Sequence, residues 1–540
     1  MKEEKVIVDQ ELAKEAEEHL EKAEYGERRL SGIPFYIAFA LAFAMSCFQL
    51  YTAAFGTLTA TLQRSVHLSF ALILCFIFYP MFKKSKKKTI PFYDFILAGV
   101  AGWVAIYVGL FYKQLILRIG NPTPLDLVMG VLTILLILEA ARRAVGIFLP
   151  LIAGIFVLYT FIGPYIPVDL LAHRGYSIRR VVDHLYLTME GIFGIPIWVS
   201  STFVFAFVLF GAVLERTGAG EYLINLAFSL FGHTRGGPAK ASVVASGFMG
   251  TVTGSSIANA ATVGTMTIPL MKKVGFSAEV AGGIETAAGG NGQIMPPVMG
   301  EAAFVMAEWL GIPYLEVCKA AALPAVIDQL ALLGAVHLLS VKNGIKGLPK
   351  SELPKFWSTF LKGIHFFIPV AVLLFYLIFM HYTPLTSACM GVLSAMGIFI
   401  LMGLKKSLGN LLSRKGIEKN IQSEESWTPL ADSVGKLICA MFQGARTMAG
   451  VAATCACAGI IVGVVTLTGL GLNMTMIITG FAGENLLLGL FLTMIACLIL
   501  GMGVPTTPTY IILATIVPPA LQAMAPDTPI IAIHLFIFYF

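Results

Sequence analysis

The stretch that decides the fold is GSSIANAATVG, residues 254–264, together with GGNGQIMPP, residues 289–297. Both lie in an apolar part of the chain, yet glycine, serine, threonine, asparagine and proline interrupt them. At membrane depth such breaks are tolerated only where the backbone is buried in protein or lines a cavity, and transporters build substrate and ion sites from discontinuous helices. The two stretches therefore predict a polar site within an integral membrane protein.

A second broken segment, GMGVPTTPTY at residues 501–510, matches the first in spacing. Gly254 is followed by Pro269, and Gly503 by Pro518, 15 residues later in both cases. Paired broken segments are typical of a transporter built from repeats, with its site where the repeats meet. We therefore expect two inverted-repeat re-entrant hairpins with polar tips. The hairpins are expected near residues 247–270 and 501–520, and a broken helix near residues 281–300.

Residues of these types suit ion binding. Glycine and proline break a helix, so freed backbone carbonyls can coordinate a hard cation such as Na⁺, and half-helix N-termini offer N–H groups to an anion. The competing interpretation is that the small residues only permit close helix packing, which is their commoner use in membranes. Two polar tips with flanking prolines at equal spacing favour the ion site.

The composition places most of the chain in a membrane. Of its 540 residues, 57% are hydrophobic and 13% are charged, whereas a soluble domain carries about 25% charged residues. Apolar runs long enough to cross a hydrocarbon core of ~30 Å recur along nearly the whole length. The net charge of +6 is concentrated in short loops without aromatic interleaving, which argues against nucleic-acid binding. The predicted fold class is all-α, a polytopic transmembrane helical protein.

Charged segments divide the chain into parts. A charged cytoplasmic segment is expected at residues 1–32, scaffold spans at 33–165, a polar connector at 166–190, the first half of a transport domain at 191–404, a basic cytoplasmic loop at 405–431 and the second half at 432–540. The expected spans are Ile33 to Phe55, His67 to Phe82, Phe95 to Tyr112, Leu125 to Ala141, Gly146 to Tyr165, one from about Ile192, Phe366 to Tyr382, Ser387 to Leu404, and further apolar helices within Val434 to Leu500.

Basic loops predict the orientation. The Lys83 to Lys88 run follows the second expected span, and Arg142-Arg143 follows the fourth. Placing both on the cytoplasmic side satisfies the positive-inside bias and puts the N-terminus in the cytoplasm. A polar insert from about residue 168 to 184, which holds His173-Arg174 and Arg179-Arg180, would then lie outside and weakens the bias locally.

Three motifs resemble a known family. IPLM at 268–271, QIMPPVMG at 293–300 and AEWLGIPY at 307–314 resemble the membrane subunit of TRAP transporters of the TAXI type. GMGVPTTPTY at 501–510 is similar to the second hairpin of that family. The segment from Ile33 to about Tyr165 is similar to the small four-span subunit, here fused ahead of the large, DctM-like one.

The resemblance implies a Na⁺-coupled, elevator-type symporter of the cytoplasmic (inner) membrane. It implies a TAXI-type extracytoplasmic solute-binding protein as partner, a small carboxylate as substrate, no nucleic acid, and no cofactor besides Na⁺ as the coupling ion. The implied first sodium site consists of Ser255, Ser256, Asn259, Gly290, Gly292, Met295 and Pro296. The implied second hairpin tip consists of Gly503, Thr506, Thr507 and Pro508.

Other polar residues are candidates for the substrate or ion pathway. Carboxylates within apolar surroundings are functional candidates by default, and Glu285 is the strongest of them, ahead of Glu301 and Asp328. The alternative is that these carboxylates reach an interface or pair with a lysine. Neither tip contains an arginine, so a substrate carboxylate would be held by hairpin N-termini. The further pathway candidates are Thr253, Thr262 and Asn291.

The repeat spacing also bears on the end of the chain. Pro296 lies 27 residues after Pro269, and an equivalent residue after Pro518 would fall just beyond Phe540. We therefore expect that the last broken helix is missing and that the second ion site is incomplete.

Rival function classes lack their motifs. An intramembrane enzyme needs a nucleophile beside a base, and none can be assembled from the nine histidines. A channel needs a selectivity ring rather than paired hairpins, and a non-transporting assembly subunit stays possible. The sequence favours secondary active uptake of a small organic anion, with no enzymatic activity.

Overall fold

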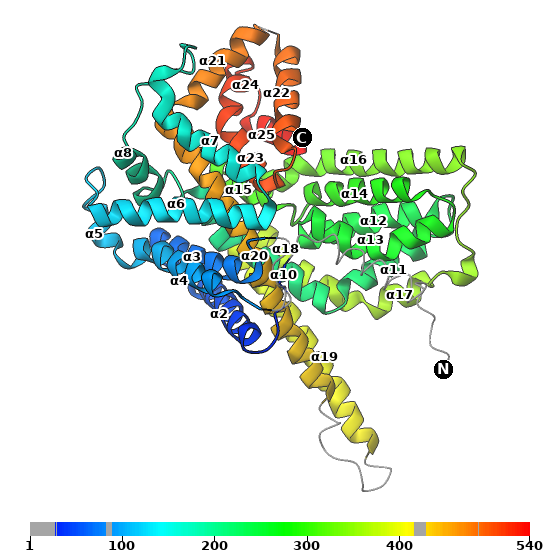
Figure 1. Cartoon of the computed structure of the whole chain (residues 1–540). Coiled ribbons are helices and arrows are strands. Elements are labelled where there is room, and N and C mark those ends of the chain that lie inside the picture. Colours follow the sequence, from blue (N-terminus) through cyan, green and yellow to red (C-terminus); the bar gives the residue numbers. More distant parts are fainter. Residues whose placement is uncertain (1–26, 29, 83–88, 415–427, 484) are drawn as a thin grey trace. The chain divides into compact units, whose positions relative to one another are not determined.

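The computed structural model describes residues 27–540 except 29, 83–88, 415–427 and 484. Within these ranges the regular structure is helical throughout, without strands (Figure 1). Nine of the described helical segments are long and apolar enough to cross a bilayer, so the prediction of an all-α, multi-pass membrane protein is confirmed. The nine are Ile33–Phe55, Ala60–Phe78, Phe92–Leu110, Pro124–Val145, Phe148–Tyr165, Ile195–Arg216, Tyr314–Lys342, Pro384–Gly409 and Pro429–Thr468.

Local sequence fixes the helix ends. The helix α6 (Pro124–Val145) begins after Thr123, whose hydroxyl accepts a hydrogen bond from the Asp126 N–H in a capping box, with proline at the first helical position. Gly146 (φ 91°) ends it after a last turn that carries two arginines. The next helix, α7 (Phe148–Ile162), leaves Leu151 and other large apolar side chains exposed, as expected for a lipid-facing surface.

Two compact units make up the chain, and each is described by itself. The first contains residues 206–300 and 318–443, and the second contains residues 25–205, 301–317 and 444–540. The expected first hairpin lies in the first unit and the second hairpin in the second unit.

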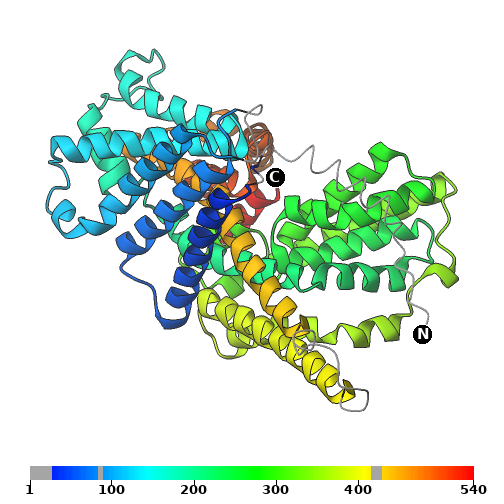
Figure 2. The same cartoon turned by 60° about the horizontal axis from the view of Figure 1, so that its bottom comes forward.

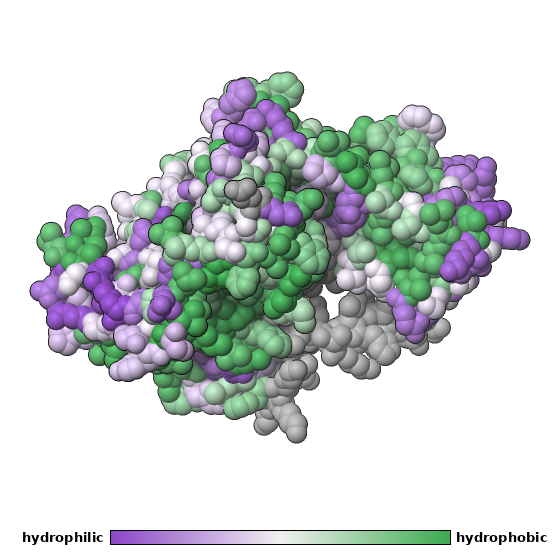
Figure 3. Space-filling view, turned by 90° about the horizontal axis from the view of Figure 1, so that it is seen from above, coloured by the Kyte–Doolittle hydropathy of each residue, from purple (hydrophilic) through white to green (hydrophobic). Residues whose placement is uncertain are grey.

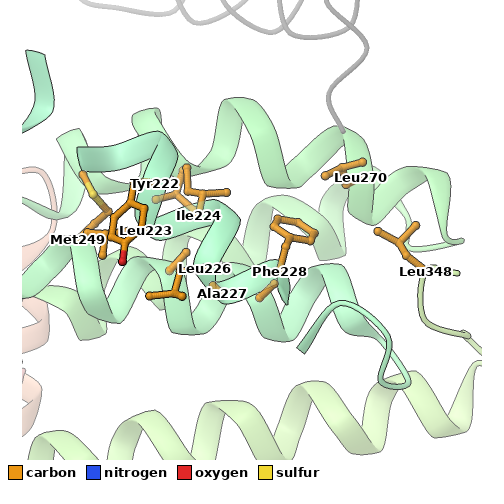
Figure 4. Packing of buried hydrophobic residues seen from close by; sticks show 12 residues of the cluster. Tyr222, Leu223, Ile224, Leu226, Ala227, Phe228, Met249, Leu270 and Leu348 are labelled. Carbon is orange, nitrogen blue, oxygen red and sulfur yellow. The ribbon is translucent and has the colours of Figure 1, made fainter. Parts of the chain in front are cut away.

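In the first unit, short helices pack around an apolar cluster. Figure 4 shows the cluster extending along these helices, from Tyr222 and Met249 at one end, past Phe228, to Leu270 and Leu348 at the other. Helices of this unit include α11 (Ala219–Phe231), α12 (Gly237–Thr253), α13 (Ser256–Lys273), α14 (Ala278–Ile294), α17 (Phe356–Lys362), α18 (Phe367–Leu374) and α19 (Pro384–Arg414). The helices α12, α13 and α14 pack against one another, as the green region of Figure 1 shows.

The second unit contains the N-terminal helices, drawn in blue and cyan in Figure 2. At its centre the carboxylate of Asp94 is fully buried between Arg28 and Arg143, with 2.7 Å from Asp94 Oδ1 to a guanidinium nitrogen of Arg143. Helices of this unit include α2 (Ile33–Phe55), α3 (Ala60–Phe78), α4 (Phe92–Leu110), α5 (Tyr112–Ile116), α6, α7, α8 (Ile178–Val182), α9 (Ile195–Val199), α15 (Glu301–Leu310), α21 (Leu470–Ala482), α22 (Leu486–Gly501), α23 (Thr506–Ile516), α24 (Pro518–Met524) and α25 (Ile530–Tyr539).

Helix bounds differ from expectation in several places, and α3 begins at Ala60 rather than at His67. The helix α16 (Tyr314–Lys342) was not among the expected spans, because Pro324 and Asp328 interrupt its apolar run, yet the helix continues through both. The helix α19 continues to Arg414, into the expected basic loop. The helix α20 (Thr428–Thr468) is one helix of 41 residues and begins before the expected Val434. In the span expected from about Ile192, α10 (Phe205–Arg216) follows a π-helical turn at Ser200–Val204.

The surface is mostly apolar on the face drawn in Figure 3, with polar patches between the apolar areas. Large apolar side chains are exposed on many helices, including Leu135, Ile155, Leu330 and Leu401. A soluble monomer rarely exposes contiguous apolar patches beyond a few hundred Å², so this surface fits contact with lipid.

Candidate functional site

The first hairpin turns at a glycine that no other residue can replace easily. The helix α12 ends at Thr253 and α13 begins at Ser256, with Gly254 between them at φ +63°. A Cβ atom at Gly254 would lie 2.1 Å from the carbonyl oxygen of Met299. The tip therefore packs directly on the backbone that follows α14, as expected for a hairpin tip that meets a broken helix.

The broken helix is interrupted between Ile294 and residue 301. The helix α14 ends at Ile294, and residues 295–300 are not helical. The N–H of Gly300 donates to the carbonyl of Gln293 over 2.6 Å, and Met299 adopts a left-handed φ of +60°. The candidates Met295 and Pro296 lie within this break, beside the hairpin tip.

Glycines bring the backbones of α12 and α14 into contact. A Cβ atom at Gly250 would lie 2.3 Å from the Cα atom of Gly292, and one at Gly289 would lie 3.1 Å from the carbonyl oxygen of Ser256. At Gly250 a side chain would displace the facing backbone of α14, whereas the contact of Gly289 with Ser256 of α13 is tight but less restrictive. The site therefore has walls of backbone and small side chains.

Asn259 lies at the centre of this arrangement. It is 0% exposed, and its side-chain NH₂ group donates to the carbonyl of Ser246 over 2.8 Å. Its Oδ1 atom is also buried and has no hydrogen-bond partner among the described residues. An unsatisfied buried acceptor costs about 1–3 kcal/mol, so this oxygen marks a place where a donor or a cation would be stabilising.

A buried carboxylate lies next to Asn259 through Ser246. Glu285 is 2% exposed and accepts hydrogen bonds from the hydroxyls of Ser242 (2.5 Å), Ser246 (3.2 Å) and Thr267 (2.5 Å). It makes no ion pair within the part of the chain that the structure describes. Ser246 thus connects the two groups, because its carbonyl accepts from Asn259 while its hydroxyl donates to Glu285.

The second tip has different partners. The chain breaks between α22 and α23 at residues 502–505, and Gly503 takes φ +83°. The Thr507 hydroxyl donates to Glu301 Oε2 over 3.1 Å, within the second unit. Thr506 begins α23, and Thr507 and Pro508 are buried in its first turn. Pro518 begins the separate helix α24, whereas Pro269 lies inside α13, so equal spacing does not give the two prolines equal roles.

Not every candidate residue joins the first site. Ser255, Ser256, Asn259 and Gly292 lie at the contact between the tip and α14, but Gly290 is exposed and a Cβ atom there would meet nothing within 4 Å. Thr262 donates to Glu215 at the exposed surface, and Asn291 is half-buried. The side chain of Thr253 lies outside the described residues.

Sequence reasoning missed Ser242, Ser246 and Gly250. These residues recur every four positions and reach the tip at Gly254, so they form one stripe of small residues along α12. That stripe was readable in the sequence. The pairing of Glu301 with Thr507 was not, because 206 residues separate the two.

Comparison with known proteins gives a consistent match. The model of the family described as "Tripartite ATP-independent periplasmic transporter, DctM component" matches residues 132–540. The matched range begins inside α6, so the four N-terminal helices α2 to α5 precede it. Both hairpins and the broken helix lie within it.

Individual relatives are similar over shorter ranges. The sialic acid TRAP transporter permease protein SiaT of Haemophilus influenzae is 28% identical over 154 residues, 28% of this chain and 25% of that protein. The 2,3-diketo-L-gulonate TRAP transporter large permease protein YiaN of Escherichia coli is 25% identical over 168 residues, 31% of this chain and 39% of that protein. The C4-dicarboxylate TRAP transporter large permease protein DctM of Pseudomonas aeruginosa is 26% identical over 190 residues, 35% of this chain and 42% of that protein. The chain spans less than half the length of these three relatives.

Proposed function

This chain belongs to the DctM component family of tripartite ATP-independent periplasmic transporters, and from that premise we propose that it is the membrane permease of a Na⁺-coupled uptake system for a small organic anion. It would act as a transporter and not as an enzyme. The Na⁺ ion would be co-transported cargo and not a resident cofactor.

The observation that carries the proposal is the orphaned carboxamide oxygen of Asn259. This atom is buried beside the glycine contact of α12 and α14, where Gly250 and Gly292 leave no room for side chains. Hard cations prefer oxygen ligands such as amide carbonyls. A Na⁺ ion bound here would remove the cost of an unsatisfied buried acceptor. Backbone carbonyl oxygens of the tip and of the non-helical residues 295–300 are the further type of ligand that such a site would use.

Glu285 supports a cation at this place. A carboxylate without an ion pair is costly at membrane depth, and its three hydroxyl donors offset only part of that cost. A positive charge near Asn259 would interact favourably with it through Ser246. Glu285 is therefore proposed as a positioning residue that favours the cation through Ser246 without contacting it. The alternative role, proton uptake by Glu285, is distinguished by the experiment below.

The substrate class follows from the tips and from the relatives' names. Neither tip stretch, 254–264 or 501–510, contains an arginine, so backbone N–H groups at the starts of α13 and α23 are the available anion donors. The relatives described above are named for sialic acid, 2,3-diketo-L-gulonate and C4-dicarboxylates. All three are organic anions, and we extend that class, a small carboxylate, to this chain.

The remaining parts of the system are inferred from the family and from the N-terminal spans. We propose an extracytoplasmic TAXI-type solute-binding protein that delivers the substrate, location in the inner membrane with the N-terminus in the cytoplasm, and an elevator movement. The helices α2 to α5 precede the family match. We propose that they belong to a fused small subunit that serves as a scaffold.

The test is uptake of radiolabelled carboxylates into proteoliposomes that contain the chain and its candidate binding protein. Inward Na⁺ and H⁺ gradients are applied separately. Uptake driven by Na⁺, lost in Asn259→Ala and retained in the surface variant Thr262→Ala, is the expected result. Uptake driven by H⁺ alone would contradict Na⁺ coupling, uptake without any gradient would favour a channel, and no uptake by a folded protein would favour an assembly subunit.

A further inference from the structure

The first unit contains a polar cavity far from the proposed ion site. The cavity has a volume of about 940 Å³. It is reached by Lys273, the last residue of α13, whereas Asn259 lies in the first turn of the same helix. Its lining includes Lys273, Lys355 and Lys362 as well as Glu221 and Glu352, all within the first unit.

The lining is rich in cationic groups that come from separate elements. Lys273 is on α13, and Lys355 and Lys362 stand at the two ends of α17. Lys273 Nζ lies 3.8 Å from Glu352 Oε2, with side chains 61% and 47% exposed. An exposed pair at that separation contributes about 0–1 kcal/mol, so Glu352 weakens the attraction of Lys273 for another anion without abolishing it.

The wall formed by α17 is held firmly in place. The Tyr222 hydroxyl of α11 donates to the carbonyl of Phe360 over 3.3 Å, and a Cβ atom at Gly363 would lie 2.1 Å from the Tyr222 ring. Phe356 and Phe360 pack against the apolar cluster drawn in Figure 4. The backbone positions from which Lys355 and Lys362 reach the cavity are therefore held by the packing of α17.

The outer face of α17 is apolar. Trp357 is 70% exposed and Leu361 is 63% exposed. Neither lines the cavity, and at about 100° per residue both lie on the side of α17 away from Lys355 and Lys362. Within the segment from Lys342 to Lys362, Lys355 and Lys362 are the lysines that line the cavity. Exposed aromatic and aliphatic side chains beside lysines are typical of a helix in the plane of the membrane interface, and lysine clusters next to a span attract anionic lipids.

We propose that this cavity binds the phosphate of an anionic phospholipid, such as phosphatidylglycerol, with the acyl chains beside Trp357 and Leu361. Three ammonium groups from two elements can surround the phosphate oxygens. The apolar face of α17 provides a surface on which acyl chains can pack. A soluble phosphate compound has no acyl chains and would leave that face uncovered. A bound lipid would connect the base of hairpin arm α13 to α17.

The experiment uses the full chain in detergent, where no charged membrane surface attracts lipid nonspecifically. Native mass spectrometry follows titration with short-chain phosphatidylglycerol, phosphatidylcholine or glycerol 3-phosphate. The site variant is Lys273→Gln/Lys355→Gln/Lys362→Gln. The matched control is Lys342→Gln/Lys346→Gln/Lys350→Gln, which removes the same charge from exposed lysines outside the cavity lining.

The site variant should bind phosphatidylglycerol at least about tenfold more weakly than the unaltered chain, because each lysine near an anionic headgroup raises the binding affinity about fivefold. The control variant should bind it as tightly as the unaltered chain does. Glu352→Gln should bind it more tightly, which tests the site without loss of folding. Equal weakening in both triple variants would overturn the proposal. So would equal affinity for phosphatidylcholine, and glycerol 3-phosphate binding as tightly as the lipid would overturn the lipid as the phosphate source.

Discussion

The contact of Gly292 with Asn259 gives the sharpest test of the proposed ion site, because two neighbouring glycines of α14 differ in their surroundings. A Cβ atom at Gly292 would lie 2.6 Å from the Asn259 side-chain nitrogen and 2.9 Å from the carbonyl oxygen of Ser246. A Cβ atom at Gly290, two positions earlier on α14, would meet nothing within 4 Å. The substitutions Gly292→Ala and Gly290→Ala add the same methyl group to the same helix.

The expected magnitudes follow from these contacts. Forcing an extra methyl into a packed site costs about 1–3 kcal/mol, and the Asn259 side chain cannot retreat without losing its hydrogen bond to Ser246. Alanine in an exposed helical position gains roughly 0.5–1 kcal/mol over glycine. Gly292→Ala should therefore displace Asn259 and weaken Na⁺ binding about 5- to 150-fold, since 1.4 kcal/mol corresponds to about tenfold.

The measurement is the Na⁺ concentration that gives half-maximal uptake in proteoliposomes, together with thermal unfolding of both variants in detergent. Gly292→Ala should need a much higher Na⁺ concentration. Gly290→Ala should keep the unaltered value and unfold at the same or a higher temperature. The reasoning is refuted if the two variants respond alike, or if Gly290→Ala alone loses Na⁺ dependence.

Three further predictions concern other buried polar groups. Glu285→Gln keeps the shape of the side chain but removes its charge, so the Na⁺ concentration for half-maximal uptake should rise by about tenfold or more; an unchanged value would exclude Glu285 from the ion site. Thr507→Val removes the hydroxyl that donates to Glu301 and should lower the unfolding temperature, because a buried acceptor left unsatisfied costs about 1–3 kcal/mol; a variant as stable as the unaltered chain would argue against that hydrogen bond. Asp94→Asn leaves two buried arginines without their shared carboxylate and should lower the free energy of unfolding by about 3–5 kcal/mol. The control Asp432→Asn, at an exposed ion pair, should lower it by less than about 1 kcal/mol. Equal unfolding temperatures of the two variants would contradict the buried cluster.

Long apolar spans were predictable because their signal is local. The helix α2 has the expected bounds, Ile33–Phe55, and α6 and α7 lie within a few residues of theirs. The local sequence does not show whether a proline ends a helix or lies within it. The helix α16 was therefore not predicted, because Pro324 lies within it. Residue type alone predicted a break at Gly254, since that position requires a left-handed backbone.

The face that each helix presents was harder to predict, and α14 shows why. Its sequence offers Gly289, Gly290, Asn291 and Gly292 in succession, and composition cannot say which of them faces the hairpin. A helix turns by about 100° per residue, so residues 4 and 7 positions after Glu285 share its face while the residue 5 positions after it points well to the side. Gly289 and Gly292 therefore share the face of Glu285, and Gly290 does not. The contacts agree, because Cβ atoms at Gly289 and Gly292 would meet neighbouring helices and one at Gly290 would meet nothing within 4 Å. A buried carboxylate must face protein rather than lipid. The sequence position of Glu285 therefore sufficed to predict which side of α14 faces the hairpin. Taking Glu285 as the reference would have predicted the contact with the hairpin at Gly292 rather than at Gly290.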